Sequence, residues 1–279
     1  MQNRFKSLSE SALVEIVGIA IFAAVIALIT DFAKPQLDGA ALVLVGIVVA
    51  FIPAVLWLIA FYRQDSLEPE PKHYVVGMFV LGAVLAQAIG QPIIRDLFRV
   101  QDWASNDLAF GFLGSIVIVG IVQEFLKYAA VRYTIFGAAE FDQPVDGIIY
   151  AASAGLGYAT MLNIHYVIDN GGVDLGVGAI RCAVEALAQA STAGVVGYFL
   201  GQAKFKKMGP LWLPLGLLLA AALNGVINLL LERAPLFGSG FAFNNWASLI
   251  AAVVVAGGIF GALLTIMRRL NSATIARMQ

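Results

Sequence analysis

The chain has 279 residues, of which 60% are hydrophobic and only 13% carry a charged side chain, and its mean hydropathy is +0.86. A soluble domain has roughly a quarter of its residues charged, so this composition excludes a soluble protein and indicates an integral membrane protein. The net charge of −1 argues against nucleic acid as a partner. Cys182 is the single cysteine, which excludes an internal disulfide.

Apolar segments long enough to cross a bilayer follow one another along the chain. A spanning helix needs about 20 mostly apolar residues. Eight segments meet this requirement, at residues 12–32, 40–62, 74–97, 108–133, 146–168, 177–201, 210–231 and 246–267. Their short connections predict an all-α, polytopic membrane helix bundle that forms one domain over residues 1–279. The first segment is expected to be retained as a helix, because no small-residue cleavage site follows it.

The distribution of lysine and arginine predicts the orientation of the bundle. Eleven of these residues lie in the loops and ends on one side, and four lie on the other. Cytoplasmic loops carry the excess of positive charge, so both termini are expected to be cytoplasmic. Aromatic residues near predicted helix ends are expected to anchor the bundle at the membrane interfaces. These residues are Trp57, Tyr62, Trp103, Trp212 and Trp246.

The predicted span 108–133 contains the sequence Gln123, Glu124, Phe125, Leu126, Lys127. Ionisable residues inside a membrane are costly and are candidates for a functional site. Glu124 and Lys127 are three residues apart, so they share a helix face and can form an ion pair. Such a pair can fix helix packing, or Glu124 can act as the general base for a water molecule. Gln123 cannot act as a base, because an amide takes up no proton near neutral pH.

The later spans carry polar residues at helical spacing. Arg181, Glu185 and Gln189 are each four residues apart, and we expect Arg181 and Glu185 to form a salt bridge within their helix. Asn224 and Asn228 are also four apart. Interhelical hydrogen bonds of such amides give about 0.6 to 2 kcal/mol each in membranes, so a packing role is their simplest interpretation.

Several stretches between residues 55 and 230 combine acidic, aromatic and glycine residues in a distinctive order. They are Tyr62 to Pro71, Gln123 to Lys127, Asp146 to Asn163, Gly197 to Gly201, and Leu223 to Asn228. In the same order they resemble the motifs Asp-x-x-Glu-Pro-Glu-Pro, Glu-Glu-x-x-Lys, Asp-Gly-x-x-Tyr through Glu-Asn, Gly-Tyr-x-x-Gly, and His-x-x-x-Asn. These motifs belong to the PrsW-type glutamic intramembrane proteases, which are related to the CAAX-protease-like superfamily. The resemblance implies a protease-like core over residues 55–230 and a location in a bacterial inner membrane.

The sequence departs from that family pattern at the positions that carry the chemistry. Amide or apolar residues replace the expected glutamates at Gln123 and Leu162 and the expected histidines at Gln189 and Asn224. The motif residues that remain are Glu124, Lys127, Asp146, Asn163 and Asn228. In the mechanism that the resemblance implies, a glutamate activates water and neighbouring side chains stabilise the oxyanion.

Three functions are compatible with this pattern. The losses favour a catalytically inactive homologue, a pseudoprotease, that binds another integral membrane protein or serves as a structural subunit of a membrane complex. The alternative is an active intramembrane endopeptidase that uses Glu124 as its general base. The third is a protein that binds lipid or another small molecule in the former active-site cavity. The sequence predicts no cofactor and no metal site, because the spans contain no set of three His or Glu ligands.

Overall fold

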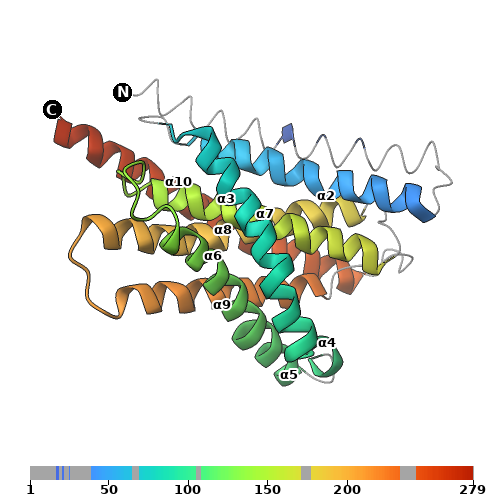
Figure 1. The fold of residues 1–279 in the computed structure, drawn as a ribbon. Helices are drawn as coiled ribbons and strands as arrows, with labels where there is room; N and C mark the ends of the chain where they lie inside the picture. Colours follow the sequence, from blue (N-terminus) through green and yellow to red (C-terminus); the bar gives the residue numbers. More distant parts are fainter. Residues whose placement is uncertain are drawn as a thin grey trace.

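A computed structural model of the chain describes residues 39–64, 69–104, 108–170, 177–232 and 243–278, together with residues 17, 18, 21 and 25. Every regular element in this described part is helical. The helices pack side by side into a bundle (Figure 1). The predicted all-helical membrane bundle is therefore confirmed.

Five helical segments of the described part are long and apolar enough to cross a membrane. They are α2 (Gly39–Tyr62), the segment Lys72–Trp103, the segment Ala109–Tyr133, α9 (Trp212–Glu232), and Ala247–Thr274 within α10 (Phe243–Met278). Most of their boundaries lie within a few residues of the predicted spans; the second and last segments run six to seven residues further. The predicted span 12–32 falls almost entirely outside the described residues. The count of eight spans and the cytoplasmic position of both termini thus stay predictions.

Two of the spanning segments contain wide helical turns. The first begins as α3 (Lys72–Leu85), continues through the π-helical stretches η2 (Ala86–Gly90) and η3 (Pro92–Leu97), and is followed by α4 (Val100–Trp103). The other runs through α5 (Leu108–Phe112), the π-helical stretch η4 (Leu113–Gly120) and α6 (Ile121–Tyr133). Such π-helical turns occur frequently at functional sites. Here η3 and η4 both border the cavity described below.

The helices α7 (Asp146–Asp169) and α8 (Val177–Phe205) lie at the centre of the bundle (Figure 1). They correspond to the predicted spans 146–168 and 177–201. Residues 146–160 of α7 are all buried. The two backbones approach so closely that a Cβ atom on Gly197 would lie 2.0 Å from the carbonyl oxygen of Gly147. Because their neighbours shield these helices from lipid, they can carry polar residues at low cost.

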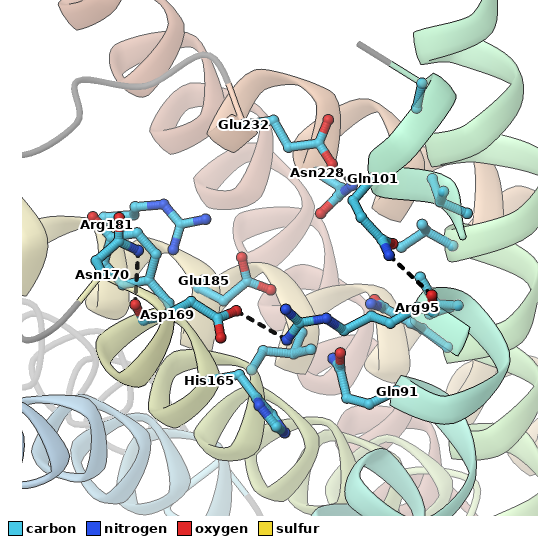
Figure 2. Close-up of a pocket in the computed structure, with 17 residues that line it drawn as sticks. Gln91, Arg95, Gln101, His165, Asp169, Asn170, Arg181, Glu185, Asn228 and Glu232 are labelled. Atoms are coloured by element: carbon cyan, nitrogen blue, oxygen red, sulfur yellow. Dashed lines mark hydrogen bonds and ion pairs between the residues drawn. The ribbon is translucent and has the colours of Figure 1, made fainter. Parts of the chain in front are cut away.

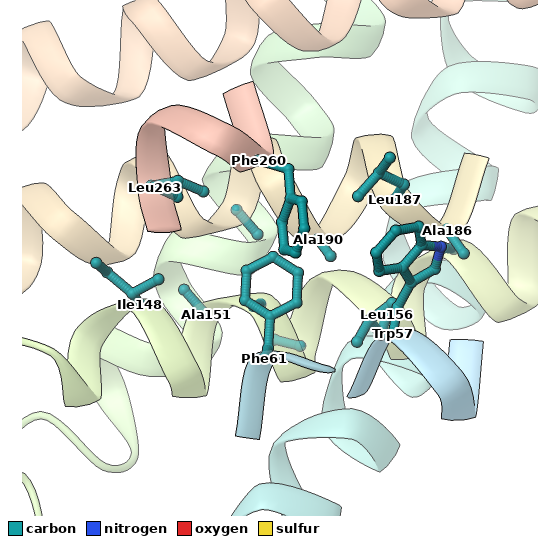
Figure 3. Close-up of a cluster of buried hydrophobic side chains, with 14 of the residues drawn as sticks. Trp57, Phe61, Ile148, Ala151, Leu156, Ala186, Leu187, Ala190, Phe260 and Leu263 are labelled. Atoms are coloured by element: carbon teal, nitrogen blue, oxygen red, sulfur yellow. The ribbon is translucent and has the colours of Figure 1, made fainter. Parts of the chain in front are cut away.

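Aromatic side chains join α2 and α10 to this centre (Figure 3). The ring of Phe260 lies 5.2 Å from those of Trp57 and Phe61, measured between centroids, in edge-to-face geometry. The prediction that Trp57 anchors the membrane interface is wrong. This residue is 5% exposed, and its indole N–H donates to the carbonyl oxygen of Ala183 at 3.2 Å. A buried tryptophan is stable where its N–H has such a partner. The side chain of Trp246 lies outside the described residues.

Glu70 ties the segment after α2 to the beginning of α7. Its buried carboxylate accepts a hydrogen bond from the Tyr150 hydroxyl, and the Tyr62 hydroxyl donates to the Glu70 carbonyl oxygen at 3.0 Å. Burial raises the pKa of the Glu70 carboxyl above its usual value, and the Tyr150 hydrogen bond opposes that rise. Residues 65–68 of the same stretch lie outside the described part.

Candidate active site

Five of the nine motif positions meet in one buried polar cluster between α6, α8 and α9. Each of them is at most 3% exposed. They are Gln123, Glu124 and Lys127 from α6, Gln189 from α8, and Asn224 from α9. Residues about 100 positions apart in the chain are thus brought within hydrogen-bonding distance.

Lys127 and Glu124 form the charged part of this cluster. The ammonium Nζ of Lys127 lies 2.5 Å from Oε1 of Glu124 and 2.6 Å from Oε1 of Gln189, to both of which it donates. It also donates to the hydroxyl of Thr192 at 3.4 Å. The expected ion pair between Glu124 and Lys127 is therefore present, and both side chains are fully enclosed.

Gln189 connects the charged pair to the remaining amides. Its Nε2 lies 2.8 Å from Oε1 of Gln123, 3.0 Å from Oε1 of Glu185 and 3.2 Å from Oδ1 of Asn224. Asn224 donates through Nδ2 to Oε1 of Gln123 at 2.9 Å and to Oε1 of Glu124 at 2.8 Å. Buried polar groups in such a network hold one another in fixed orientations.

A cavity of about 470 Å³ adjoins the cluster, and Figure 2 shows the side chains that line it. Its wall is formed by the ends of α7 and α9, the beginning of α8, and the wide turns of η3 and η4. Arg95 and Asp169 form an ion pair of 2.9 Å at its edge. Gln123 and Glu185 belong to both the polar cluster and the cavity wall, whereas Glu124 is fully buried and does not line it.

The expected salt bridge between Arg181 and Glu185 is not formed. The guanidinium of Arg181 lies 3.9 Å from the centroid of the Tyr166 ring instead, a cation–π contact. Glu185 instead accepts a hydrogen bond from Gln189, which lies one helical turn away in the opposite direction from Arg181. The spacing of four residues allowed both partners, and the aromatic ring on α7 decided between them.

Three of the four remaining motif positions lie around the cluster rather than in it. The fourth, Asp146, is the first residue of α7, and its carboxylate accepts from the backbone N–H of Gln143 at 2.6 Å. Leu162 and Asn228 line the cavity. Asn228 donates to Glu232 at 3.0 Å and to Ser115 at 3.4 Å. Asn163 is fully buried and donates to the carbonyl oxygen of Cys182 at 3.0 Å, so it joins α7 to α8.

Glu185 is the site residue that sequence reasoning missed. Its spacing from Gln189 was visible, but the more obvious partner was Arg181 at equal spacing on the other side. The signal that could have identified it is its spacing. Glu185 lies one helical turn before Gln189, an amide at a position where the family pattern has a histidine.

The fold and the site together define a polytopic helical membrane protein with a buried polar cluster beside a cavity of mixed polar and apolar lining. A family model described as PrsW family intramembrane metalloprotease matches residues 70–260. Protease PrsW of Geobacillus kaustophilus is 32% identical over 212 residues, which cover 74% of this chain and 89% of that protein. Protease PrsW of Bacillus subtilis is 30% identical over 196 residues, covering 70% and 82% of the two chains. The chain belongs to the PrsW family.

A more distant relative is Protease PrsW of Clostridioides difficile, 26% identical over 189 residues. No solved structure matches the chain significantly.

The description of the family implies a metal ion, but the donors of this cluster do not fit one. A protease zinc ion needs three His, Glu, Asp or Cys ligands. In the described ranges no three such residues are grouped closely enough to bind a metal. The Lys127 ammonium also lies between Glu124 and Gln189, where it would repel a second cation.

Proposed function

We propose that this chain is an intramembrane endopeptidase that hydrolyses a peptide bond of another membrane protein. The observation that carries the proposal is the shared wall between the polar cluster and the cavity, formed by Gln123 and Glu185. Peptide hydrolysis needs a group that accepts a proton from water, a donor for the developing oxyanion, and room for the substrate backbone. The cavity offers a carboxylate, an amide and about 470 Å³ side by side.

The names of the relatives support the same proposal. Each of the proteins compared above is called Protease PrsW, and each shares most of its length with this chain. Their bacterial sources support a location in a bacterial inner membrane. With the predicted orientation, the cavity opens on the extracytoplasmic side, because the connection between α7 and α8 lies there. The scissile bond of the substrate is then near the outer surface of the membrane.

The direct test is reconstitution of the full-length chain in liposomes together with a detergent extract of bacterial single-span membrane proteins. Mass spectrometry of the products is expected to find new N-termini near the outer ends of substrate helices. Protein-free liposomes serve as the control and should lack these termini. If the purified chain generates no termini beyond those of protein-free liposomes, the proposal is wrong.

A second candidate is the pseudoprotease that binds another membrane protein or serves as a complex subunit. The specific observation in its favour is that amides occupy positions 123, 189 and 224 and that Lys127 holds Glu124 at 2.5 Å. This function predicts a stoichiometric integral membrane partner after purification in mild detergent, together with an absence of cleavage in the reconstitution.

A further inference from the structure

We propose that Glu185 is the general base of this site and that Gln123 donates a hydrogen bond to the oxyanion. This inference rests on the proposed endopeptidase function and adds to it a residue outside the family motifs. It also differs from the alternative in which Glu124 is the base.

Glu185 lies in the wall of the cavity, where a general base can reach a water molecule. It is 5% exposed, yet it lines the cavity and points into it between Arg181 and Arg95 (Figure 2). Its Oε1 accepts from Nε2 of Gln189 at 3.0 Å, and Oε2 has no hydrogen bond to any described residue. One oxygen is thus held by the cluster, and the other is available to a water molecule in the cavity.

The other carboxylates near the cavity have different environments. Asp169 is paired with Arg95 at 2.9 Å, and Glu232 accepts from Asn228 at 3.0 Å at the far side of the wall. Glu124 is enclosed on all sides and accepts from Lys127 and Asn224. Among the described residues, Glu185 is therefore the carboxylate that both faces the cavity and contacts the amide cluster.

The ion pair fixes the direction in which the Gln123 amide points. An ammonium only donates, so Lys127 requires Oε1 of Gln189 to face it, which turns Nε2 of Gln189 toward Gln123. A carboxylate accepts from donors, so Glu124 turns Nδ2 of Asn224 toward itself and Gln123. Oε1 of Gln123 receives both donors.

This orientation leaves Nε2 of Gln123 as the free end of the amide. It has no acceptor among the described residues, and Gln123 lines the cavity. A donor in this position, held by a network that does not reorganise, can stabilise negative charge that develops nearby. The replacement of glutamate by glutamine at position 123 thus exchanges a carboxylate for an oxyanion donor.

The two residues complete a balanced hydrolysis. The Glu185 carboxylate takes a proton from water while the water oxygen forms a bond to the carbonyl carbon of the substrate. The carbonyl oxygen gains the negative charge and accepts the hydrogen bond from Nε2 of Gln123. When the C–N bond breaks, the proton passes from Glu185 to the leaving nitrogen, which gives an amine and a carboxylic acid.

The test compares variants of the full-length chain in liposomes with a single-span reporter protein that the wild type cleaves. Glu185→Gln keeps an acceptor for Gln189 and should lower kcat about 10²- to 10⁴-fold with little change in KM or melting temperature. Gln123→Met should lower kcat about 10²- to 10³-fold. The matched control Glu70→Gln changes a buried carboxylate at the opposite end of the bundle and should leave kcat unchanged.

A pH profile separates a catalytic from a structural role of Glu185. In the wild type, kcat/KM should fall at acid pH as one group becomes protonated. Glu185→Asp should retain this fall at a lower rate, whereas the residual activity of Glu185→Gln should lack it. A Glu185→Gln variant with wild-type kcat would overturn the inference and leave the endopeptidase function standing. Loss of cleavage in Glu124→Gln without loss of folding would also overturn the inference and leave the endopeptidase function standing. A wild type that cleaves nothing would contradict the endopeptidase function itself.

Discussion

Lys127 and Glu124 act in this structure as a pair that orients neighbouring amides. Both charges are enclosed, and the pair is joined at 2.5 Å. A buried ion pair is costly to form, but removal of one partner is worse, because the other charge is left unpaired in a medium of low dielectric. The pair therefore matters most for the arrangement of Gln189 and Asn224.

A double-mutant cycle tests this role of the pair. Lys127→Met should destabilise the protein by about 3 to 5 kcal/mol, because Glu124 loses its counter-charge. The double variant Glu124→Gln with Lys127→Met should be more stable than Lys127→Met alone, since no unpaired charge remains. Thermal unfolding in detergent measures both. Strict additivity of the two single substitutions would contradict a coupled pair.

Glu70 gives a pH-dependent contribution to stability outside the membrane. Its pKa is raised by burial, so the folded state binds the proton more tightly than the unfolded state. The contribution is fully present below the unfolded pKa near 4.5 and is lost as the pH rises through the higher folded pKa. The melting temperature of the wild type relative to Glu70→Gln should therefore fall as the pH rises from about 4.5 through the higher folded pKa. A constant difference over this range would show that Glu70 does not titrate differently on folding.

At the scale of elements, the contact between α7 and α8 depends on glycine. A Cβ atom on Gly197 would lie 2.0 Å from a backbone oxygen of α7, which cannot move without separating the helices. Gly197→Ala should therefore lower the melting temperature, although alanine in a helix interior is otherwise favoured by about 0.5 to 1 kcal/mol. Gly257→Ala on α10, where nothing lies within 4 Å, is the matched control and should be neutral or stabilising. Equal effects of the two substitutions would contradict close packing at Gly197.

The helices could be predicted from the sequence, and most of the side-chain partners could not. Long apolar runs set the ends of α2 and α9 to within a few residues, because the bilayer fixes the required length. Spacing identified the pair of Glu124 and Lys127, since both lie on one helix. It could not tell whether Glu185 bonds Arg181 or Gln189, because a ring on another helix decides that.

The convergence of the motif positions illustrates the same limit. Gln123, Gln189 and Asn224 come from three helices, and no local pattern places their amides within 3.2 Å of one another. The resemblance to a family grouped these positions without giving their orientations. Trp57 was misplaced for a related reason, since its carbonyl partner belongs to α8.

At the scale of the whole molecule, the orientation in the membrane determines which side the substrate comes from. Cys182 is buried and free, so introduced cysteines can be labelled against a low background. In intact cells, an impermeant maleimide should label Gln101→Cys at the cavity. It should label Lys207→Cys, after α8, only once the inner membrane has been permeabilised. The reverse pattern would contradict the predicted cytoplasmic termini and place the cavity inside the cell.

Hydrolysis in water enriched in ¹⁸O tests the central claim most directly. The purified full-length chain is reconstituted with a single-span substrate, and the new C-terminal carboxyl group of the product is analysed by mass spectrometry. The account predicts one ¹⁸O atom in that carboxyl group for the wild type and about 10²- to 10⁴-fold slower formation of this product by Glu185→Gln. Intact substrate in both samples would contradict it and favour a binding subunit that retains the family fold without its chemistry.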